Sequence, residues 1–471
     1  MSRKKKNKEP ELLQAVTVSD MAADGLALAR ENDKVYFLEG AVPGDVVDAK
    51  VYRDKKRYAM AQVTRLVQPS PDRQAAACQH FEHCGGCKWQ NLSYDKQLFY
   101  KGKQVYDALT RLGKIDLTEK VPVLGAVEAF HFRNKLEFTF SPNRWFTPEE
   151  LADESLVKPQ AGVGFHLPGR FDKVLHVNEC LLMDDRMNLI RNHVHQLAEA
   201  KGLTRYNIRE HHGFLRTLTI RHTTRDQWMV LLMVGEDQPE NLALVLDSLA
   251  TAFPWITSLL YVVNTKKNDT LFDQEVRVWR GADVIEEQLE GLVFEISAKS
   301  FFQTNSRQAL RLYEITRDYA GLTGEEVVYD LYTGTGSIAQ FVAAAAKKVI
   351  GVEYVEAAVE DARKNAARNN IANCSFFAGD MKDLLNDDFV AEHGRPDVVI
   401  TDPPRAGMHP DVVEMLCRLG APRIVYVSCN VATQARDLDL MRNHYRLVKY
   451  QPVDMFPQTA HVENVALLEK I

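Results

Sequence analysis

The sequence predicts an α/β protein whose C-terminal domain, residues 299–471, is built on a parallel sheet. Two short β-branched runs, 398–401 and 424–427, end in turn residues, as buried parallel strands do. A third run, 327–332, leads through a glycine turn into an alanine-rich helical stretch. Ligands of such sheets bind just beyond the carboxyl ends of the strands, so we expect the functional site there.

The N-terminal segment predicts a separate small β-barrel over residues 10–70. Polar and apolar residues alternate there, with turn residues at Asp24, Gly25 and 43–45. Basic residues stand beside aromatic ones, which suits phosphate neutralisation and base stacking, although a solvated face would look the same. They are Tyr52, Arg53, Lys55, Lys56, Arg57 and Tyr58. Before the barrel, the lysine-rich residues 1–9 predict a disordered basic arm that can touch phosphate.

Residues 71–298 predict a central, mainly antiparallel β domain, because short alternating runs such as 215–220 and 228–232 recur along it. A helical stretch at about 93–112 is expected either within this domain or packed on the C-terminal one. The net charge of −6 argues against a simple basic coat protein but leaves room for local positive patches. No apolar run reaches about 18 residues, so no membrane span is expected.

A nucleotide site is indicated at the first strand of the C-terminal domain. Gly334 and Gly336 let the backbone approach a ligand closely, and the following helix supplies free N–H groups. Glu353 ends the next strand, nineteen residues beyond Gly334, where a carboxylate can accept from ribose hydroxyls.

The same turn narrows the choice of nucleotide. Position 339 is alanine, so the third glycine of the dinucleotide fingerprint is absent, and no Walker A lysine is present. NAD and nucleoside triphosphates are therefore disfavoured, and S-adenosylmethionine fits better. Asp380, which ends a third strand, could accept from the adenine amino group, and Asp402 ends a fourth.

Cys429 follows the strand at 424–427 and is a candidate nucleophile beside this site. A lone cysteine after a strand is otherwise a small buried hydrophobe. The neighbouring motifs favour the nucleophile.

These motifs resemble the S-adenosylmethionine-dependent RNA uracil-5-methyltransferases. The matching segments are 301–305, 330–336, 402–407, 428–430 and 461–463. The resemblance implies a class I methyltransferase domain, Rossmann-like, preceded by an OB-like TRAM barrel at residues 10–70. It also implies cofactor contacts from Gln303, Tyr332, Ser337, Glu353, Asp380 and Asp402.

Uracil methylation explains the need for two reacting side chains. Carbon 5 of uracil attacks a methyl group only after a thiolate has added to carbon 6, a step that we assign to Cys429. A base must then remove the carbon 5 proton so that the thiolate can leave. The match across residues 461–463 implies Glu463 as that base, with His461 as local support, although such a glutamate is often a solvated surface carboxylate. Arg405 argues against methylation of an exocyclic amine and is expected to form a structural ion pair or to contact the substrate.

A second signal is the cysteine cluster Cys78, Cys84 and Cys87. Without a signal peptide, a disulfide network is not expected, and the spacing is open to zinc or an iron–sulfur cluster. The resemblance adds Cys180 as the fourth ligand and implies a [4Fe–4S] cluster with a structural or RNA-positioning role.

The barrel and the cysteines together favour the 23S ribosomal RNA branch of the family, because the shorter transfer-RNA enzymes commonly lack both. A tRNA uracil-5-methyltransferase and an rRNA cytosine-5-methyltransferase are the enzymatic alternatives. A non-catalytic RNA-binding assembly protein is the alternative of another class. We expect a cytoplasmic monomer with no protein partner.

Overall fold

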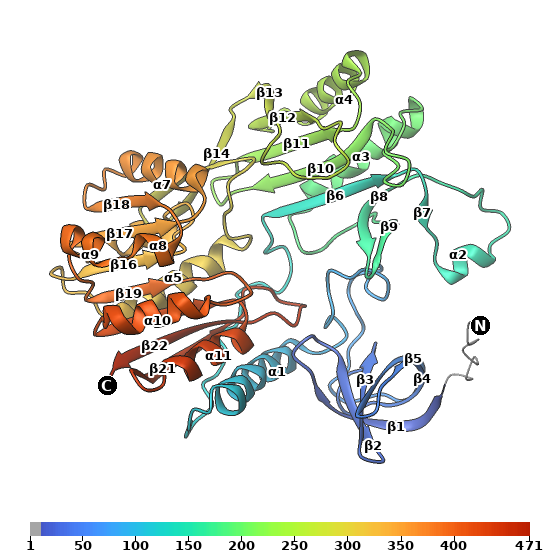
Figure 1. Ribbon diagram of the computed structural model, residues 1–471. Helices are drawn as coiled ribbons and strands as arrows, with labels where there is room; N and C mark the ends of the chain where they lie inside the picture. Colours follow the sequence, from blue (N-terminus) through green and yellow to red (C-terminus); the bar gives the residue numbers. More distant parts are fainter. Residues whose placement is uncertain (1–10) are drawn as a thin grey trace, which may run out of the picture.

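The computed structural model describes residues 11–471, so the predicted basic arm lies outside the described residues. The chain forms three domains in succession (Figure 1): a barrel, a central sheet domain and a C-terminal sheet domain. The barrel and the C-terminal domain lie on either side of a long helix, and the central domain covers the other end of the molecule.

The N-terminal barrel is closed, with strand order β1-β2-β3-β5-β4. Its strands are β1 Leu12–Met21, β2 Ala27–Glu31, β3 Lys34–Glu39, β4 Val46–Asp54 and β5 Tyr58–Gln68. Alanines such as Ala29, Ala49 and Ala61 fill much of its interior and are fully or almost fully buried. Small inward-facing side chains suit the narrow interior of a five-stranded barrel, as the predicted OB-like TRAM fold requires.

Asp45 ties the barrel to the segment that follows it. Its side chain is fully buried, accepts from the Val42 and Ser70 N–H groups at 2.8 and 2.9 Å, and pairs with Arg73. The burial itself raises the pKa of this carboxyl, but Arg73 and the two N–H groups outweigh that effect and lower the pKa below its usual value.

The central domain contains an eight-stranded sheet with order β13-β12-β11-β10-β6-β8-β9-β7. Its strands are β6 Lys135–Ser141, β7 Arg144–Trp145, β8 Gly162–Leu167, β9 Arg170–His176, β10 Leu215–His222, β11 Trp228–Val234, β12 Ser258–Val263 and β13 Arg277–Gly281. Most pairings are antiparallel, as predicted, but β11 pairs with β12 and β7 with β9 in parallel. Its helices are α2 Pro148–Ala152, α3 Arg186–Ala200 and α4 Pro239–Ala252.

A separate hairpin, β14 Val284–Leu289 with β15 Leu292–Ser297, joins this domain to the C-terminal one. Its buried residues Ile285, Phe294 and Ile296 pack in the same core as the C-terminal sheet. The same core also contains Met229 and Leu231 of β11, so the hairpin packs between the central and the C-terminal sheets.

The C-terminal sheet has order β18-β17-β16-β19-β20-β22-β21. Its strands are β16 Val327–Leu331, β17 Lys348–Glu353, β18 Cys374–Ala378, β19 Val398–Thr401, β20 Arg423–Ser428, β21 Tyr445–Val453 and β22 Glu463–Lys470. The first five run parallel, whereas β22 lies antiparallel between β20 and β21. This is the class I methyltransferase fold, and it confirms the predicted fold class.

Helices cover both faces of this sheet. On one face pack α5 Ser306–Ala320, α6 Ser337–Ala343 and α7 Glu356–Arg368. On the other face pack α8 Met381–Leu384, α9 Asp387–His393, α10 Pro410–Leu419 and α11 Val431–Met441. Neighbouring strand residues such as Val328 and Tyr329 therefore enter different cores, as buried strands require.

The long helix α1, Tyr94–Asp107, continues through a π-helical turn at Ala108–Leu112. Although it precedes the central domain in the chain, it packs on α11 and β21 (Figure 1). Val105 and Leu109 join the core of the C-terminal domain there. No helix among residues 11–471 combines the length and the apolar character that a membrane crossing needs.

Replacing Asp45 with alanine should destabilise the protein by about 3 kcal/mol, because Arg73 and two N–H groups would lose a buried partner. Chemical unfolding measures the change. The matched control is Asp54→Ala, which breaks the exposed ion pair with Lys34 and should have little effect. Equal losses in the two variants would contradict the anchoring role of Asp45.

Candidate active site

The turn after β16 has a shape that glycine makes possible. Gly334 and Gly336 adopt φ angles of 55° and 73°, and Tyr332 also lies in the left-handed region. A Cβ on Gly336 would lie 2.8 Å from the Phe376 ring. Buried Asp330 holds the turn from below, because it accepts from the Thr333 hydroxyl and from the Ala339 N–H.

Three carboxylates stand at the neighbouring strand ends. Glu353, at the end of β17, accepts from the Gly334 N–H at 3.1 Å and from the Val355 N–H at 3.0 Å, so it fastens the glycine turn. Asp380 follows β18 and caps α8. Asp402 follows β19, where burial and nearby Asp330 raise its pKa to about 7.

Two other expected cofactor contacts lie at the edge of the same region. Ser337 begins α6, and its hydroxyl lies 2.8 Å from the Tyr313 hydroxyl. Gln303 lies in the loop before α5, and its carbonyl accepts from the Asn134 side chain at 3.0 Å. This loop is fastened to the other side of the site, since Asn305 donates to the Met455 carbonyl at 3.0 Å.

The sheet register brings Cys429 and Glu463 together. Ser428, the last residue of β20, pairs with Asn464 of antiparallel β22, so the residues just beyond this pair meet at the carboxyl edge of the parallel strands. Glu463 is only 7% exposed, which excludes the alternative of a solvated surface carboxylate.

The electrostatics agree with this proximity. Burial, Glu463 and Asp402 raise the pKa of Cys429 to about 11, and Arg405 opposes them. Burial and Asp402 raise the pKa of Glu463 to about 8, again against Arg405. Three acidic groups, the side chains of Asp402, Cys429 and Glu463, therefore lie in a poorly solvated region near one cation, Arg405.

Arg405 itself is exposed and pairs with no carboxylate among residues 11–471. Its carbonyl accepts from the Asn430 side chain at 2.9 Å, which holds the 402–407 loop beside Cys429. The ion-pair interpretation of Arg405 is therefore wrong for the described residues, and its guanidinium is free to meet a substrate.

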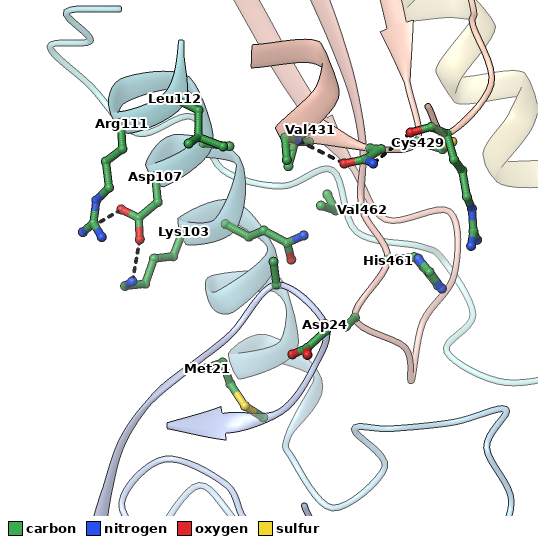
Figure 2. Close-up of a pocket in the computed structure, with 17 residues that line it drawn as sticks. Met21, Asp24, Lys103, Asp107, Arg111, Leu112, Cys429, Val431, His461 and Val462 are labelled. Atoms are coloured by element: carbon green, nitrogen blue, oxygen red, sulfur yellow. Dashed lines mark hydrogen bonds and ion pairs between the residues drawn. The ribbon is translucent and has the colours of Figure 1, made fainter. Parts of the chain in front are cut away.

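A cleft of about 520 Å³ opens at Cys429 (Figure 2). Its walls come from three distant parts of the chain: the turn after β1, helix α1, and the loops that carry Cys429 and His461. The side chains that line it from α1 and the following π-helical turn include Lys103, Asp107 and Arg111. Asp107 forms ion pairs with Lys103 and Arg111. Sequence reasoning missed these residues, although their spacing of four places them on one helical face.

The predicted basic cluster of the barrel lies elsewhere. Arg53 lies near the end of β4, and Lys55, Lys56 and Arg57 form the turn between β4 and β5. All four are exposed, and none lines the cleft. The barrel instead presents the turn containing Asp24 and Gly25. Lys88 donates to the Asp24 carbonyl and Trp89 to the Gly25 carbonyl, at 2.9 and 3.1 Å.

Cys84, Cys87 and Cys180 pack in the same hydrophobic core of the central domain. Burial raises the pKa of each of these three thiols, and other cysteines, Cys78 among them, add to the rise. None of them forms a disulfide. Within the described part of the chain, no three His, Cys, Asp or Glu side chains are grouped closely enough to hold a single metal ion. A donor set of four thiols is chemically suited to soft metals and iron–sulfur clusters, in which the ligands are spread over several metal atoms.

Comparison with known proteins agrees with this architecture. The sequence model of the tRNA (uracil-5-)-methyltransferase family matches residues 264–471, and that of the TRAM domain matches residues 13–64. Uncharacterized RNA methyltransferases of Bacteroides thetaiotaomicron and Porphyromonas gingivalis are 52% and 51% identical to this chain, over 95% and 96% of its length and 100% and 98% of theirs.

Among solved structures, the tRNA (uracil-54, C5)-methyltransferase of Pyrococcus abyssi in complex with S-adenosyl-L-homocysteine superposes with a TM-score of 0.74. It is 28% identical, and the match covers 97% of this chain and 100% of that one. On these comparisons, the chain belongs to the RNA uracil-5-methyltransferase family and carries an N-terminal TRAM domain.

Proposed function

We propose that this protein methylates carbon 5 of a uridine in 23S ribosomal RNA, with S-adenosylmethionine as the methyl donor. The observation that carries the proposal is the meeting of Cys429, which lines the cleft, and buried Glu463 across the β20–β22 pair. A nucleophile and a base are the two reacting groups that uracil methylation needs.

The cofactor would lie over the carboxyl ends of β16 to β19. Glu353 and Asp380 would accept from ribose and adenine, while Gly334 and Gly336 leave room for the backbone to approach. Tyr332, Ser337, Gln303 and Asp402 complete the expected contacts. Bound there, S-adenosylmethionine supplies an electrophilic methyl group on a positively charged sulfur. The relative from Pyrococcus abyssi, with S-adenosyl-L-homocysteine bound, supports this choice of cofactor.

Cys429 would begin the reaction by adding its sulfur to carbon 6 of the uracil. The ring electrons move toward the carbonyl oxygen at position 4, and carbon 5 becomes nucleophilic. The raised pKa of Cys429 means that its thiolate is scarce in the free protein, so the reaction depends on deprotonation in the complex. Arg405, which opposes the rise, would favour the thiolate.

Glu463 would end the reaction. Its carboxylate takes the proton from methylated carbon 5, the electrons of that C–H bond restore the double bond to carbon 6, and the sulfur–carbon bond breaks. Burial makes Glu463 a stronger base than an exposed glutamate, which helps it remove a weakly acidic proton.

The proposal also includes the type of RNA that is methylated. The combination of a TRAM barrel with four cysteines favours ribosomal RNA, and the likeness to a tRNA (uracil-54, C5)-methyltransferase makes tRNA the second candidate. The target uridine would leave its stack and enter the cleft at Cys429. Cytosine methylation and a purely RNA-binding role fit less well, because the chain belongs to a uracil-specific family and retains both reacting groups.

We also propose that Cys78, Cys84, Cys87 and Cys180 hold a [4Fe–4S] cluster with a structural role. Four thiols saturate such a cluster, and methyl transfer needs no electron. The packing of Cys84, Cys87 and Cys180 in one hydrophobic core, with their thiols unbridged, supports the proposal.

Unmodified 23S RNA labelled with tritium at uridine carbon 5 should release tritium when mixed with the native protein and S-adenosylmethionine. The Cys429→Ala variant should lose this activity by about three orders of magnitude or more. Cys417→Ala, which alters a cysteine of α10 that does not line the cleft, is the matched control and should remain active. Tritium release from labelled tRNA but not from 23S RNA would show that tRNA is the substrate. No release from either RNA would refute the proposed activity.

Protein purified without oxygen should contain about four iron atoms per chain and matching sulfide. The Cys84→Ser variant should lose both, whereas Cys374→Ser, in β18, should keep them. Elemental analysis and visible absorption measure this. Stoichiometric zinc, or no metal at all, would contradict the iron–sulfur proposal without affecting the proposed methyl transfer.

Glu463 should make the protein less stable as the pH rises from 4.5 to 8. Its pKa is 4.5 unfolded and about 8 folded, so the folded state binds the extra proton in this window and loses stability by up to about 1.4 kcal/mol per pH unit. Unfolding measurements at several pH values should therefore show a flatter pH dependence for Glu463→Gln. Parallel curves for the two proteins would mean that Glu463 is ionised throughout.

A further inference from the structure

We propose that the polar face of α1 positions Glu463 for the final step of the reaction, with Gln97 and Lys101 as positioning residues. The proposal rests on the proposed function and adds to it two residues that touch neither substrate nor cofactor. They act through the loop 454–462, which connects β21 to β22 and ends directly before Glu463.

Lys101 fastens the start of this loop. Its ammonium donates to Asp454 at 2.6 Å and to the Phe456 carbonyl at 3.0 Å, and both ionic side chains are completely buried. Asp454 also accepts from the Tyr94 hydroxyl at 2.9 Å. A buried ion pair contributes little stability beyond what apolar packing would provide, so its main effect here is to fix geometry.

Gln97 fastens the middle of the loop. Gln458 has a φ angle of 66°, which is unfavourable for a residue with a side chain. The Gln97 side chain accepts from the Gln458 N–H and donates to the Gln458 side-chain oxygen, both at 2.9 Å. Because Gln97 is fully buried, these bonds do not compete with water.

Residues 88 and 89, directly after Cys87, also bind the loop 454–462. The Lys88 and Trp89 N–H groups both donate to the Gln458 carbonyl, at 2.8 and 3.1 Å. Gln97 in turn donates to the Trp89 carbonyl at 2.9 Å. The left-handed conformation of Gln458 is thus held from two sides, and both sides lie outside the C-terminal domain in sequence.

Tyr94, Gln97 and Lys101 share one face of α1, since they are spaced by three and four residues. This face turns toward the loop, while residues such as Asp95 face solvent. Four residues, 459–462, separate Gln458 from Glu463, and only Glu463 must reach carbon 5 of the uracil. A shift of the loop should therefore slow proton removal and leave the earlier addition by Cys429 intact.

Two variants test the proposal. Gln97→Met removes the bonds to Gln458 with little change of volume. Lys101→Met combined with Asp454→Asn removes both buried charges together, so that no unpaired ion threatens folding. Asp95→Asn is the matched control on the exposed face of α1. Thermal unfolding and cofactor binding establish that each protein is folded.

In both test variants kcat for tritium release should fall about tenfold to a hundredfold, with KM for RNA nearly unchanged. The covalent protein–RNA adduct, seen on a denaturing gel, should accumulate, as we also expect for Glu463→Gln, which lacks the base of the final step. Asp95→Asn should behave like the native protein. A purely structural role would lower adduct and product together.

Native kcat in both folded test variants, or loss of activity without accumulated adduct, would overturn the positioning role. Failure of the proposed function is distinguishable, because the native protein itself would then release no tritium.

Discussion

The antiparallel insertion of β22 between β20 and β21 is the constraint on which the site depends. Parallel strands bring their carboxyl ends to one edge of the sheet, and there they can offer only residues that follow strands. Because β22 runs the other way, its first residue reaches that edge, and the pairing of Ser428 with Asn464 sets Glu463 beside Cys429. A parallel β22 of the same eight residues would carry Glu463 to the opposite edge, roughly 23 Å away.

Burial then determines the chemistry of the site. Asp402, Glu463 and Cys429 all have raised pKa values, and Arg405 is the cation that opposes the rise at the last two. In such a place a positively charged ligand favours ionised Asp402, and the surplus of acids suits a cationic cofactor better than a phosphate. Burial raises the pKa of Glu463 to about 8, so the proposed role as a base requires that the assembled complex favour its ionised form.

Local patterns predicted the fold class well and the contacts between distant segments poorly. The runs 327–332, 398–401 and 424–427 became strands because β-branched residues with turn residues behind them have few other ways to be buried. The place of β22 in the sheet could not be predicted, because the sequence of an apolar strand does not indicate which strands will be its neighbours. Gln97 and Lys101 would be assigned to water from their polarity, and their partners lie 361 and 353 residues away.

For the site too, local patterns were predictable from the sequence and contacts between distant segments were not. Residues at strand ends, such as Glu353, Asp380 and Asp402, lie where the alternation of strands and helices placed them, and their roles stay predictions. The basic turn at 53–57 shows the limit of composition, because charge on a small barrel does not say which of its turns faces the cleft. That choice is made by Lys88 and Trp89, which hold Asp24 and Gly25 against the loop before Glu463.

The cleft is therefore assembled before any substrate arrives. A Cβ on Gly25 would lie 2.9 Å from that of Ala460, so the barrel turn and the loop 454–462 are already in contact. A ligand that fills the cleft must meet the barrel, α1 and the C-terminal domain at once. A preformed cleft of three walls spares a large ligand the cost of ordering the protein. Under the proposed function, such a cleft suits an RNA whose own fold presents the target uridine, so that the shape of the RNA around that uridine contributes to the choice of target.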